Sequence, residues 1–178
     1  MSVESNLRRL SPFGMTIACN VIISTTKFYW KEPLIIKRIL CPIDFSEHNE
    51  PANEYASVLA KATGARIIYF HTLVPSLPYG TEPDNNEQTN EDRDRELLEK
   101  YKPTIEGVPA SYVIEVGTPT DRIIKYARDN EIDLIVLATH GRSGLGRLLM
   151  GSVAETVLRK GECPVLAVRA DAIVHSEN

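Results

Sequence analysis

Residues 139–152 contain the pattern in this sequence that is best suited to binding chemistry. Residues 139–150 carry three glycines, and Gly151 and Ser152 follow directly. Glycine lets the backbone take positive φ and lie close to a ligand. Ser152 and Glu155 match a capping box, which predicts that a helix begins at Ser152. A glycine-rich loop ending at a helix N-terminus is suited to an anion, because the free N–H groups and the positive end of the helix dipole face the same way.

The commonest phosphate-binding motifs do not fit this loop. Gly141 and Gly146 have the spacing of a P-loop, but Arg147 and Leu148 occupy the positions of its lysine and its serine or threonine. The Gly-x-Gly-x-x-Gly pattern of dinucleotide-binding turns is missing from the sequence as well. Phosphate is still the expected anion, and Arg142 and Arg147 would add positive charge beside it.

Strands that alternate with helices are expected to position the loop. Four consecutive aliphatic residues, 134–137, indicate a strand that is buried on both faces. The same reasoning predicts strands at 35–43, 66–72, 110–116, 133–138 and 165–168, with helices that begin at Ser46 or Asn49, near Glu91, at Thr118 and at Ser152. This order predicts an α/β fold: a single open, doubly wound, five-stranded parallel sheet with helices on both faces.

Ligands in such sheets bind at the carboxyl ends of strands, where the winding reverses. Asp44, Thr72 and Ala138 end the first, second and fourth predicted strands, so we expect them to converge. The carboxylate of Asp44 would accept hydrogen bonds from hydroxyl or amino groups of a ligand. The alternative is that Asp44 only caps the helix that follows it.

The composition is that of an ordinary globular domain. The 178 residues are 43% apolar and 25% charged, and the net charge of −4 argues against nucleic acid as a main partner. Cys19, Cys41 and Cys163 are widely spaced and odd in number, which favours neither a disulfide framework nor a zinc site and suits a reducing compartment. No resident metal is predicted, since the acids of residues 75–96 lack ordered ligand spacing and look like a solvated loop.

Three regions are expected along the chain. Residues 1–33 form an N-terminal extension that we expect to be accessory or disordered, with a targeting signal as the alternative. Their apolar run, 10–23, is broken by Pro12 and Gly14 and is too short to span a membrane. Residues 34–170 form the domain, and residues 171–178 form a C-terminal tail.

The loop and its flanking strands resemble the universal stress protein family. Gly141, the nine residues 142–150, Gly151 and Ser152 match the family's nucleotide loop, with Ala138 at the place of its first glycine. The similarity extends over residues 36–169 and includes 39–46 and 163–168. The resemblance implies a Rossmann-like fold of the adenine nucleotide alpha hydrolase-like type. It also implies a cytoplasmic, ATP-binding regulatory protein of the stress response.

The resemblance implies a nucleotide site and assigns roles within it. Asp44 would contact the nucleoside, the main chain of Thr72 would recognise adenine, and the loop would hold the phosphates, with Mg²⁺ accompanying them. The methyl group of Ala138 would be costly only if the backbone there has positive φ. No catalytic residue is predicted. The nucleotide-binding residues are Pro42, Ile43, Asp44, Thr72, Leu137, Ala138, His140, Gly141, Arg142, Gly151, Ser152 and Val153.

A homodimer is expected through the last strand, Val165 to Val168. This strand is apolar, carries neither proline nor lysine, and is expected to be an edge strand that a second copy covers, as in the family. One alternative is a nucleotide-free dimer that acts through an unknown protein partner. Another is a slow ATPase using the same cleft, with weak hydrolysis at most, because no general base has a clear activating partner. Neither a membrane nor a nucleic acid is expected as a partner.

Overall fold

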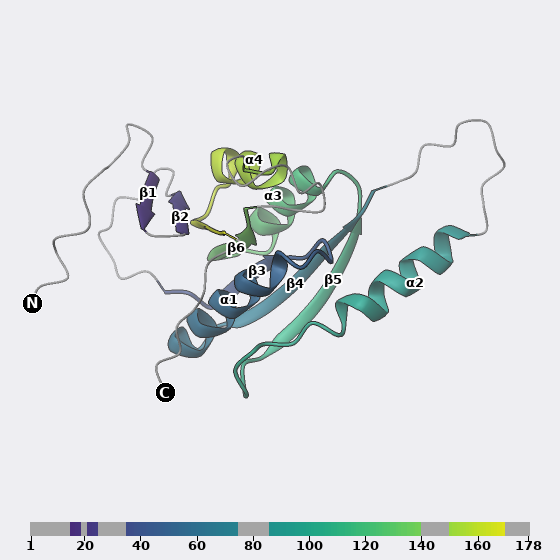
Figure 1. Ribbon diagram of the computed structural model, residues 1–178, viewed down its shortest axis with the longest axis horizontal. Coiled ribbons are helices and arrows are strands. Elements are labelled where there is room, and N and C mark those ends of the chain that lie inside the picture. Colours follow the sequence, from purple (N-terminus) through teal and green to yellow (C-terminus); the bar gives the residue numbers. More distant parts are fainter. Residues whose placement is uncertain (1–14, 19–20, 25–34, 75–85, 140–149, 170–178) are drawn as a thin grey trace, which may run out of the picture.

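The computed structural model describes residues 15–18, 21–24, 35–74, 86–139 and 150–169. Strands and helices alternate along the main part of the chain (Figure 1): β3 (Arg38–Pro42), α1 (Asn49–Thr63), β4 (Arg66–Leu73), α2 (Asn86–Leu98), β5 (Ala110–Val116), α3 (Pro119–Asp129), β6 (Leu134–Ala138), α4 (Ser152–Lys160) and β7 (Val165–Val168). Two short strands, β1 (Met15–Ala18) and β2 (Val21–Ser24), precede them. The predicted α/β fold, with five parallel strands and helices between them, is confirmed.

The winding of the sheet reverses beside β3. The strand order is β1-β2-β7-β6-β3-β4-β5, and β3 pairs in parallel with both β4 and β6. From β3 the chain proceeds through β4 to β5 at one edge, and then returns to β6 and β7 on the other side of β3. The carboxyl ends of β3 and β6 therefore flank the crevice in which open α/β sheets bind ligands.

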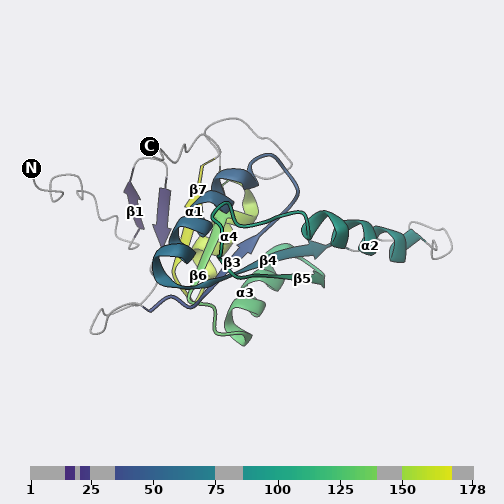
Figure 2. The ribbon, with the colours of Figure 1, turned by 90° about the horizontal axis from the view of Figure 1, so that it is seen from below.

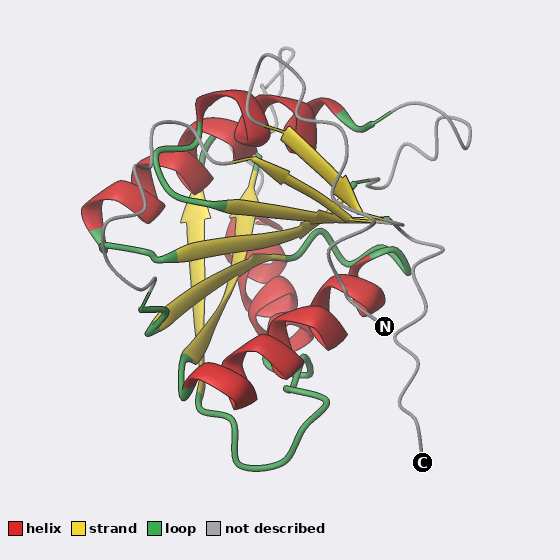
Figure 3. Cartoon of the chain, turned by 90° about the vertical axis from the view of Figure 1, so that its left-hand side faces the viewer, coloured by secondary structure: helices red, strands yellow, loops and turns green. Residues whose placement is uncertain are grey.

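Two helices cover each face of the sheet, as Figure 3 shows in side view. On one face, Ala52 and Ala56 of α1 pack against Ile39 of β3; on the other, Ile123 of α3 and Val157 of α4 pack in the second core. Successive strand residues point to opposite faces, so a strand covered on both sides must be apolar throughout. No helix in the described part of the chain is long and apolar enough to cross a membrane.

The predicted helix ends are partly right. Helix α1 ends at Gly64 in the left-handed conformation, with φ 74°, and α3 has Thr118 as N-cap and Pro119 in its first turn, as predicted. The predicted helix starts at Asn49 and Ser152 are confirmed, but neither Ser46 nor Asn49 is the N-cap of α1, and the predicted capping box at Ser152 is wrong. The N-cap residues are His48 and Gly151, neither makes a side-chain cap hydrogen bond, and the Glu155 N–H donates to the Gly151 carbonyl at 3.0 Å.

The helix predicted to begin near Glu91 is present as α2, but it begins earlier, at Asn86, inside the acidic segment predicted as a loop. This helix lies on the β5 side of the molecule (Figure 1). Leu98 anchors it, because that side chain is 1% exposed within the core under α1. An ion pair one turn apart, between Arg95 and Glu91 at 3.1 Å, adds a few tenths of a kcal/mol, roughly. Tertiary docking at one end therefore stabilises a helix whose composition alone favours a loop.

The last strand is not an edge strand. Strand β2 pairs with β7 in antiparallel register, from Val21 opposite Val168 to Ser24 opposite Val165. Figure 2 shows β1 and β2 beside β7. The expectation of an uncovered apolar edge at Val165–Val168 is therefore wrong, because the N-terminal extension supplies the neighbouring strand. The local pattern of β7 carries no information about a partner so far away in sequence.

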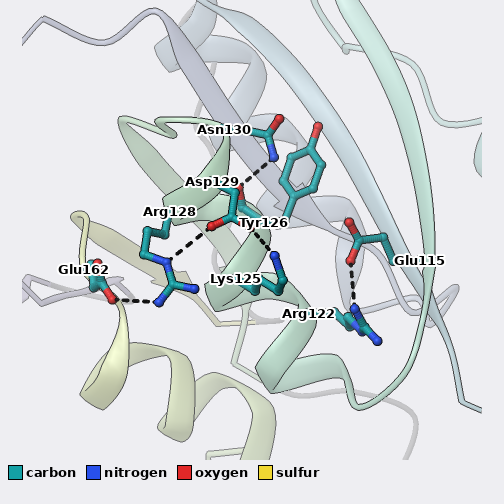
Figure 4. Close-up of polar contacts among 8 residues, drawn as sticks. All are labelled: Glu115, Arg122, Lys125, Tyr126, Arg128, Asp129, Asn130 and Glu162. Carbon is teal, nitrogen blue, oxygen red and sulfur yellow. Dashed lines mark hydrogen bonds and ion pairs between the residues drawn. The ribbon is translucent and has the colours of Figure 1, made fainter.

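Surface ion pairs surround α3 (Figure 4). Arg122 lies 3.9 Å from Glu115 of β5, and Arg128 lies 3.6 Å from Glu162, which follows α4. Within α3, the pKa of Asp129 is lowered, mainly by the hydrogen bond that Lys125 donates to it. Exposed pairs of this kind contribute little to stability, so burial of the apolar face of α3 must hold it in place.

Candidate functional site

A cavity of about 350 Å³ lies at the carboxyl ends of β3, β4 and β6, and the starts of α1, α3 and α4 close it. This volume is sufficient for a small-molecule ligand. Its apolar walls come from Pro42, Ile43, Phe70, Val74, Pro119, Ile123, Leu137, Ala138, Val153 and Ala154. The polar groups that line it belong to Asp44, Asn49, His71, Thr72, Thr139 and Ser152, together with the backbone of Gly151.

The structure brings the predicted site residues together. Every one of them that the structure describes lines this cavity: Pro42, Ile43, Asp44, Thr72, Leu137, Ala138, Gly151, Ser152 and Val153. The other predicted residues, His140, Gly141 and Arg142, lie outside the described residues, as does Arg147. The predicted residues that the structure describes come from the ends of β3, β4 and β6 and from the start of α4, and they share one cavity.

Asp44 lies just beyond the end of β3, and its carboxylate is held by several donors. Its Oδ1 accepts hydrogen bonds from the Ser46 N–H at 3.1 Å, the Ser46 hydroxyl at 2.7 Å and the Asn49 side-chain amide at 2.6 Å. Asp44 is not the N-cap of α1, since His48 takes that position. The alternative role of a simple helix cap is therefore wrong.

The backbone beside Asp44 is fixed as well. The Ile43 N–H donates to the Phe70 carbonyl at 2.8 Å, and the Ile43 carbonyl lies 2.7 Å from Nδ1 of His71. A carbonyl only accepts, so Nδ1 carries a proton. The next residue, Phe45, has a φ of 63°, which is uncommon for a residue with a large side chain. Strained backbone persists where the surroundings over-determine it, and it is often found at functional sites.

His71 is a cavity residue that the sequence reasoning did not assign to the site. Its side chain is buried, its Nε2 lies 3.5 Å from Oδ2 of Asp94 in α2, and its ring lies 4.2 Å from that of Phe45. It therefore links the cavity wall to α2. The available signal was its position near the carboxyl end of a buried strand, where ligands bind in such sheets.

Ala138 has a conformation that accepts a side chain. It pairs with Val168 in the β6–β7 ladder, and it is not among the described non-glycine residues with positive φ, which are Phe45 and Glu131. A methyl group costs about 1 kcal/mol or more only where positive φ is required. Alanine in place of the first loop glycine is thus compatible with the backbone of this site.

The N-terminus of α4 opens onto the cavity. The first turn supplies the N–H groups of Ser152, Val153 and Ala154, and all three residues line the cavity. The Gly151 N–H, which was expected to face a phosphate, donates instead to the Thr139 carbonyl at 2.7 Å. It therefore fastens the helix start to β6, and the N–H groups that follow it are the ones suited to an anion.

Neither cysteine of the described chain suits redox or metal chemistry. Burial raises the pKa of Cys41 to about 12 and that of Cys163 to about 11, so both thiols are protonated at neutral pH. Among the described residues, no three His, Cys, Asp or Glu side chains gather where they could hold a metal ion. Any divalent ion at this site would need ligands from the bound molecule.

Comparisons with known proteins agree with this geometry. The sequence profile of the universal stress protein family matches residues 36–169. Universal stress protein MJ0577 of Methanocaldococcus jannaschii is 30% identical, over 76% of this chain and 96% of the relative. The solved structure of MJ0577 has a TM-score of 0.68 at 31% identity, over 78% of this chain and 99% of that one. A universal stress protein solved in complex with cAMP has a TM-score of 0.50 at 25% identity, over 76% and 98% of the two chains.

Proposed function

The chain belongs to the universal stress protein family, and we propose that it is a cytoplasmic regulatory protein of the stress response that binds ATP in the cavity beside β3 and β6. The observation that carries the proposal is the joining, in one cavity, of a carboxylate held by several donors, apolar walls and a helix N-terminus. These three features suit the sugar, the base and the phosphates of a nucleotide. A related protein bound to cAMP supports a nucleotide as the ligand class.

The main chain of Thr72 is proposed to recognise the base. Phe70, two residues earlier, directs its carbonyl to Ile43 at the end of β3. Alternate residues of a strand point their main-chain groups to the same side. The N–H and carbonyl of Thr72 therefore point into the space beyond the end of β3, where an adenine edge with one donor and one acceptor would pair with them. Pro42 and Ile43 supply the apolar contact for the ring.

The α4 N-terminus is the proposed phosphate site. Helix N–H groups and the helix dipole attract an anion without any lysine, which explains how a loop without the P-loop motif would serve. Arg142 is proposed to add positive charge, and the backbone N–H of Gly141 is proposed to donate to a phosphate. Mg²⁺ would arrive with the nucleotide, since the phosphates supply most of its ligands.

Calorimetric titration of the full chain with Mg²⁺ and ATP tests the proposal. We expect ATP to bind in the micromolar range and GTP to bind more weakly, because guanine presents its donors and acceptors in a different order to the main chain of Thr72. A folded protein that releases no heat up to millimolar ATP would contradict the proposal. The nucleotide-free interaction protein would then be the better explanation.

We propose nucleotide binding rather than turnover. A general base must lie within hydrogen-bond distance of the proton that it removes. His71 directs Nδ1 to the Ile43 carbonyl and Nε2 toward Asp94, and Oδ1 of Asp44 already accepts three hydrogen bonds. These arrangements favour a stable bound state with weak hydrolysis at most. The conformation of Ala138 also removes the main reason for preferring a family member without a ligand.

A homodimer through β7 is proposed to compete with the N-terminal hairpin, residues 15–24. The hairpin occupies the β7 edge in this chain. The family match begins at residue 36, after the hairpin, and 76% of this chain is enough to cover 96% of the M. jannaschii relative. The hairpin is therefore an addition to the part that the two proteins share. Two-stranded hairpins are marginally stable by themselves, so this cover is replaceable. If β7 of a second copy replaced β2, the main-chain groups at this edge of β7 would again have hydrogen-bond partners.

Removal of residues 1–33 is expected to convert a monomer into a dimer. The truncated chain presents the apolar strand Val165–Val168 as an uncovered edge, which favours pairing with a second copy. Light scattering at micromolar concentration measures the mass of both chains, and circular dichroism confirms that both are folded. Identical masses for the full and truncated chains would show that the hairpin has no effect on assembly.

A further inference from the structure

Asn49 is a buried polar residue that contacts Asp44. It is the first residue of α1, it is 3% exposed, and it lines the cavity. Its Nδ2 donates to Oδ1 of Asp44 at 2.6 Å and to the Ser46 carbonyl at 2.9 Å. A buried amide that donates twice within one turn fixes the position of its acceptors. The orientation of the Asp44 carboxylate therefore depends on Asn49.

The donors around Asp44 suit a carboxylate that acts as an acceptor. Hydrogen bonds donated to a carboxylate oxygen favour the ionised form. Three such bonds reach Oδ1, two of them from Ser46 and one from Asn49. An ionised carboxylate accepts hydrogen bonds and does not donate them, so it favours ligand groups that carry protons and repels phosphate. The cavity thus contains a fixed acceptor at Asp44 and an anion site at α4.

A nucleotide offers two kinds of donor to such an acceptor. The amino group of adenine is flanked by ring nitrogens whose lone pairs would face the carboxylate, whereas the 2′ and 3′ hydroxyls of ribose are two adjacent donors. The main chain at Thr72 supplies both a donor and an acceptor, which suits the base edge better. Hydrogen-bonding chemistry therefore assigns the ribose hydroxyls to Asp44.

We infer that Asn49 is a positioning residue that holds Asp44 for the two ribose hydroxyls and thereby makes the site select ribonucleotides over 2′-deoxyribonucleotides. The inference rests on the proposed nucleotide function and adds its sugar specificity. A site built to accept a hydroxyl disfavours a ligand without it, because the half-buried acceptor at Asp44 loses a partner. Without Asn49, the carboxylate turns to other partners and the preference weakens.

The test compares the affinities for ATP and 2′-deoxy-ATP in three proteins. We expect the wild-type chain to bind ATP about tenfold more tightly, as one lost hydrogen bond to a charged group predicts. In Asn49→Ala the ratio is expected to fall close to one. Asn53→Ala is the matched control, because Asn53 lies one turn along α1, is also buried, and bonds to the Lys102 carbonyl and the Tyr69 hydroxyl without lining the cavity. This control is expected to lose stability and keep the ratio.

A second variant covers the case in which Asn49→Ala does not fold. Ser46→Ala removes the hydroxyl donor at 2.7 Å from the same carboxylate oxygen and lies at a half-buried position, so it is expected to fold and to lower the ratio partially. Purine riboside triphosphate, which lacks the adenine amino group, distinguishes the two kinds of donor. We expect the ratio of the affinities for ATP and for purine riboside triphosphate to be the same in Asn49→Ala and in the wild-type chain.

The outcomes separate the inference from the proposed function. Wild-type protein that binds neither nucleotide overturns the proposed function, and with it the sugar preference. Wild-type protein that binds ATP while Asn49→Ala keeps the full ratio overturns the inference alone. An equal fall of the ratio in Asn53→Ala would show general loosening of α1 and would overturn the inference. If Asn49→Ala changes only the ratio of the affinities for ATP and purine riboside triphosphate, the adenine amino group contacts Asp44, and the inference is overturned as well.

Discussion

Ser152→Glu is expected to weaken ATP binding by at least about a hundredfold while the fold stays as stable as before. Ser152 is the first residue of α4, its side chain is exposed, and it lines the cavity. A carboxylate there would lie beside the proposed phosphate site. Two unit charges at 4 Å repel by about 4 kcal/mol at an effective dielectric constant of 20, and about 2.8 kcal/mol already corresponds to a hundredfold change in affinity.

The same substitution is close to neutral for stability, which makes it a sharp test. A negative charge in the first turn of a helix stabilises it by about 0.3 to 1 kcal/mol through the helix dipole. Glu155, three residues later, repels the new carboxylate by about 0.2 to 0.5 kcal/mol. The melting temperature is therefore expected to stay nearly constant.

Controls for Ser152→Glu separate phosphate from nucleoside binding. Calorimetric titration with adenosine, which has no phosphate, is expected to give the same affinity for the variant and the wild-type chain. Ser152→Ala removes at most one hydrogen bond and is expected to weaken ATP binding by about tenfold or less. A Ser152→Glu variant that binds ATP as tightly as the wild type would place the phosphates away from the start of α4.

Strand positions were predictable because burial on both faces leaves a continuous apolar run. The predicted bounds 165–168 agree with β7, in which all four residues are buried, and the convergence of Asp44, Thr72 and Ala138 follows from the rule for parallel sheets. These features depend on local composition and on general topology. Both are present in a single sequence.

Helix starts were less predictable because a polar side chain has several possible partners. Helix α4 begins at Ser152 as predicted, yet the capping box of Ser152 and Glu155 does not form, because the Glu155 N–H donates to the Gly151 carbonyl. Asn49 looked like a cap, but its amide contacts Asp44. The choice between a local cap and a tertiary acceptor depends on the packing around the residue, which spacing alone does not encode.

Long-range partners were the features that the sequence reasoning missed. The pairing of β2 with β7 and the contact between His71 and Asp94 each join segments that local windows treat separately. The start of α2 at Asn86 has the same cause, since burial of Leu98 stabilises a helix with few apolar residues. Tertiary contacts decided these elements against their composition.

Tyr69→Ala is expected to cost about 3 to 5 kcal/mol of the free energy of unfolding, which is a large part of the stability of a domain of this size. Tyr69 of β4 is fully buried, and its ring centroid lies 5.7 Å from that of Tyr112 and 6.1 Å from that of Tyr101. Its hydroxyl donates to Oδ1 of Asn53 at 2.6 Å. Removal of the ring opens a cavity beneath α1 and also leaves that amide without its donor. Urea denaturation followed by circular dichroism measures the loss.

Tyr69→Phe divides this loss into its ring and hydroxyl parts. The ring stays, so the expected cost is about 1 to 3 kcal/mol, the penalty for a buried acceptor that loses its donor. Burial first, and then the nearby Cys41, raise the pKa of Tyr69 far above its ordinary value. The folded state therefore keeps this proton where the unfolded state loses it, so stability falls as the pH rises past about 10. The decline between pH 8 and pH 10.5 is expected to be smaller in Tyr69→Phe, and an unchanged decline would mean that other groups cause it.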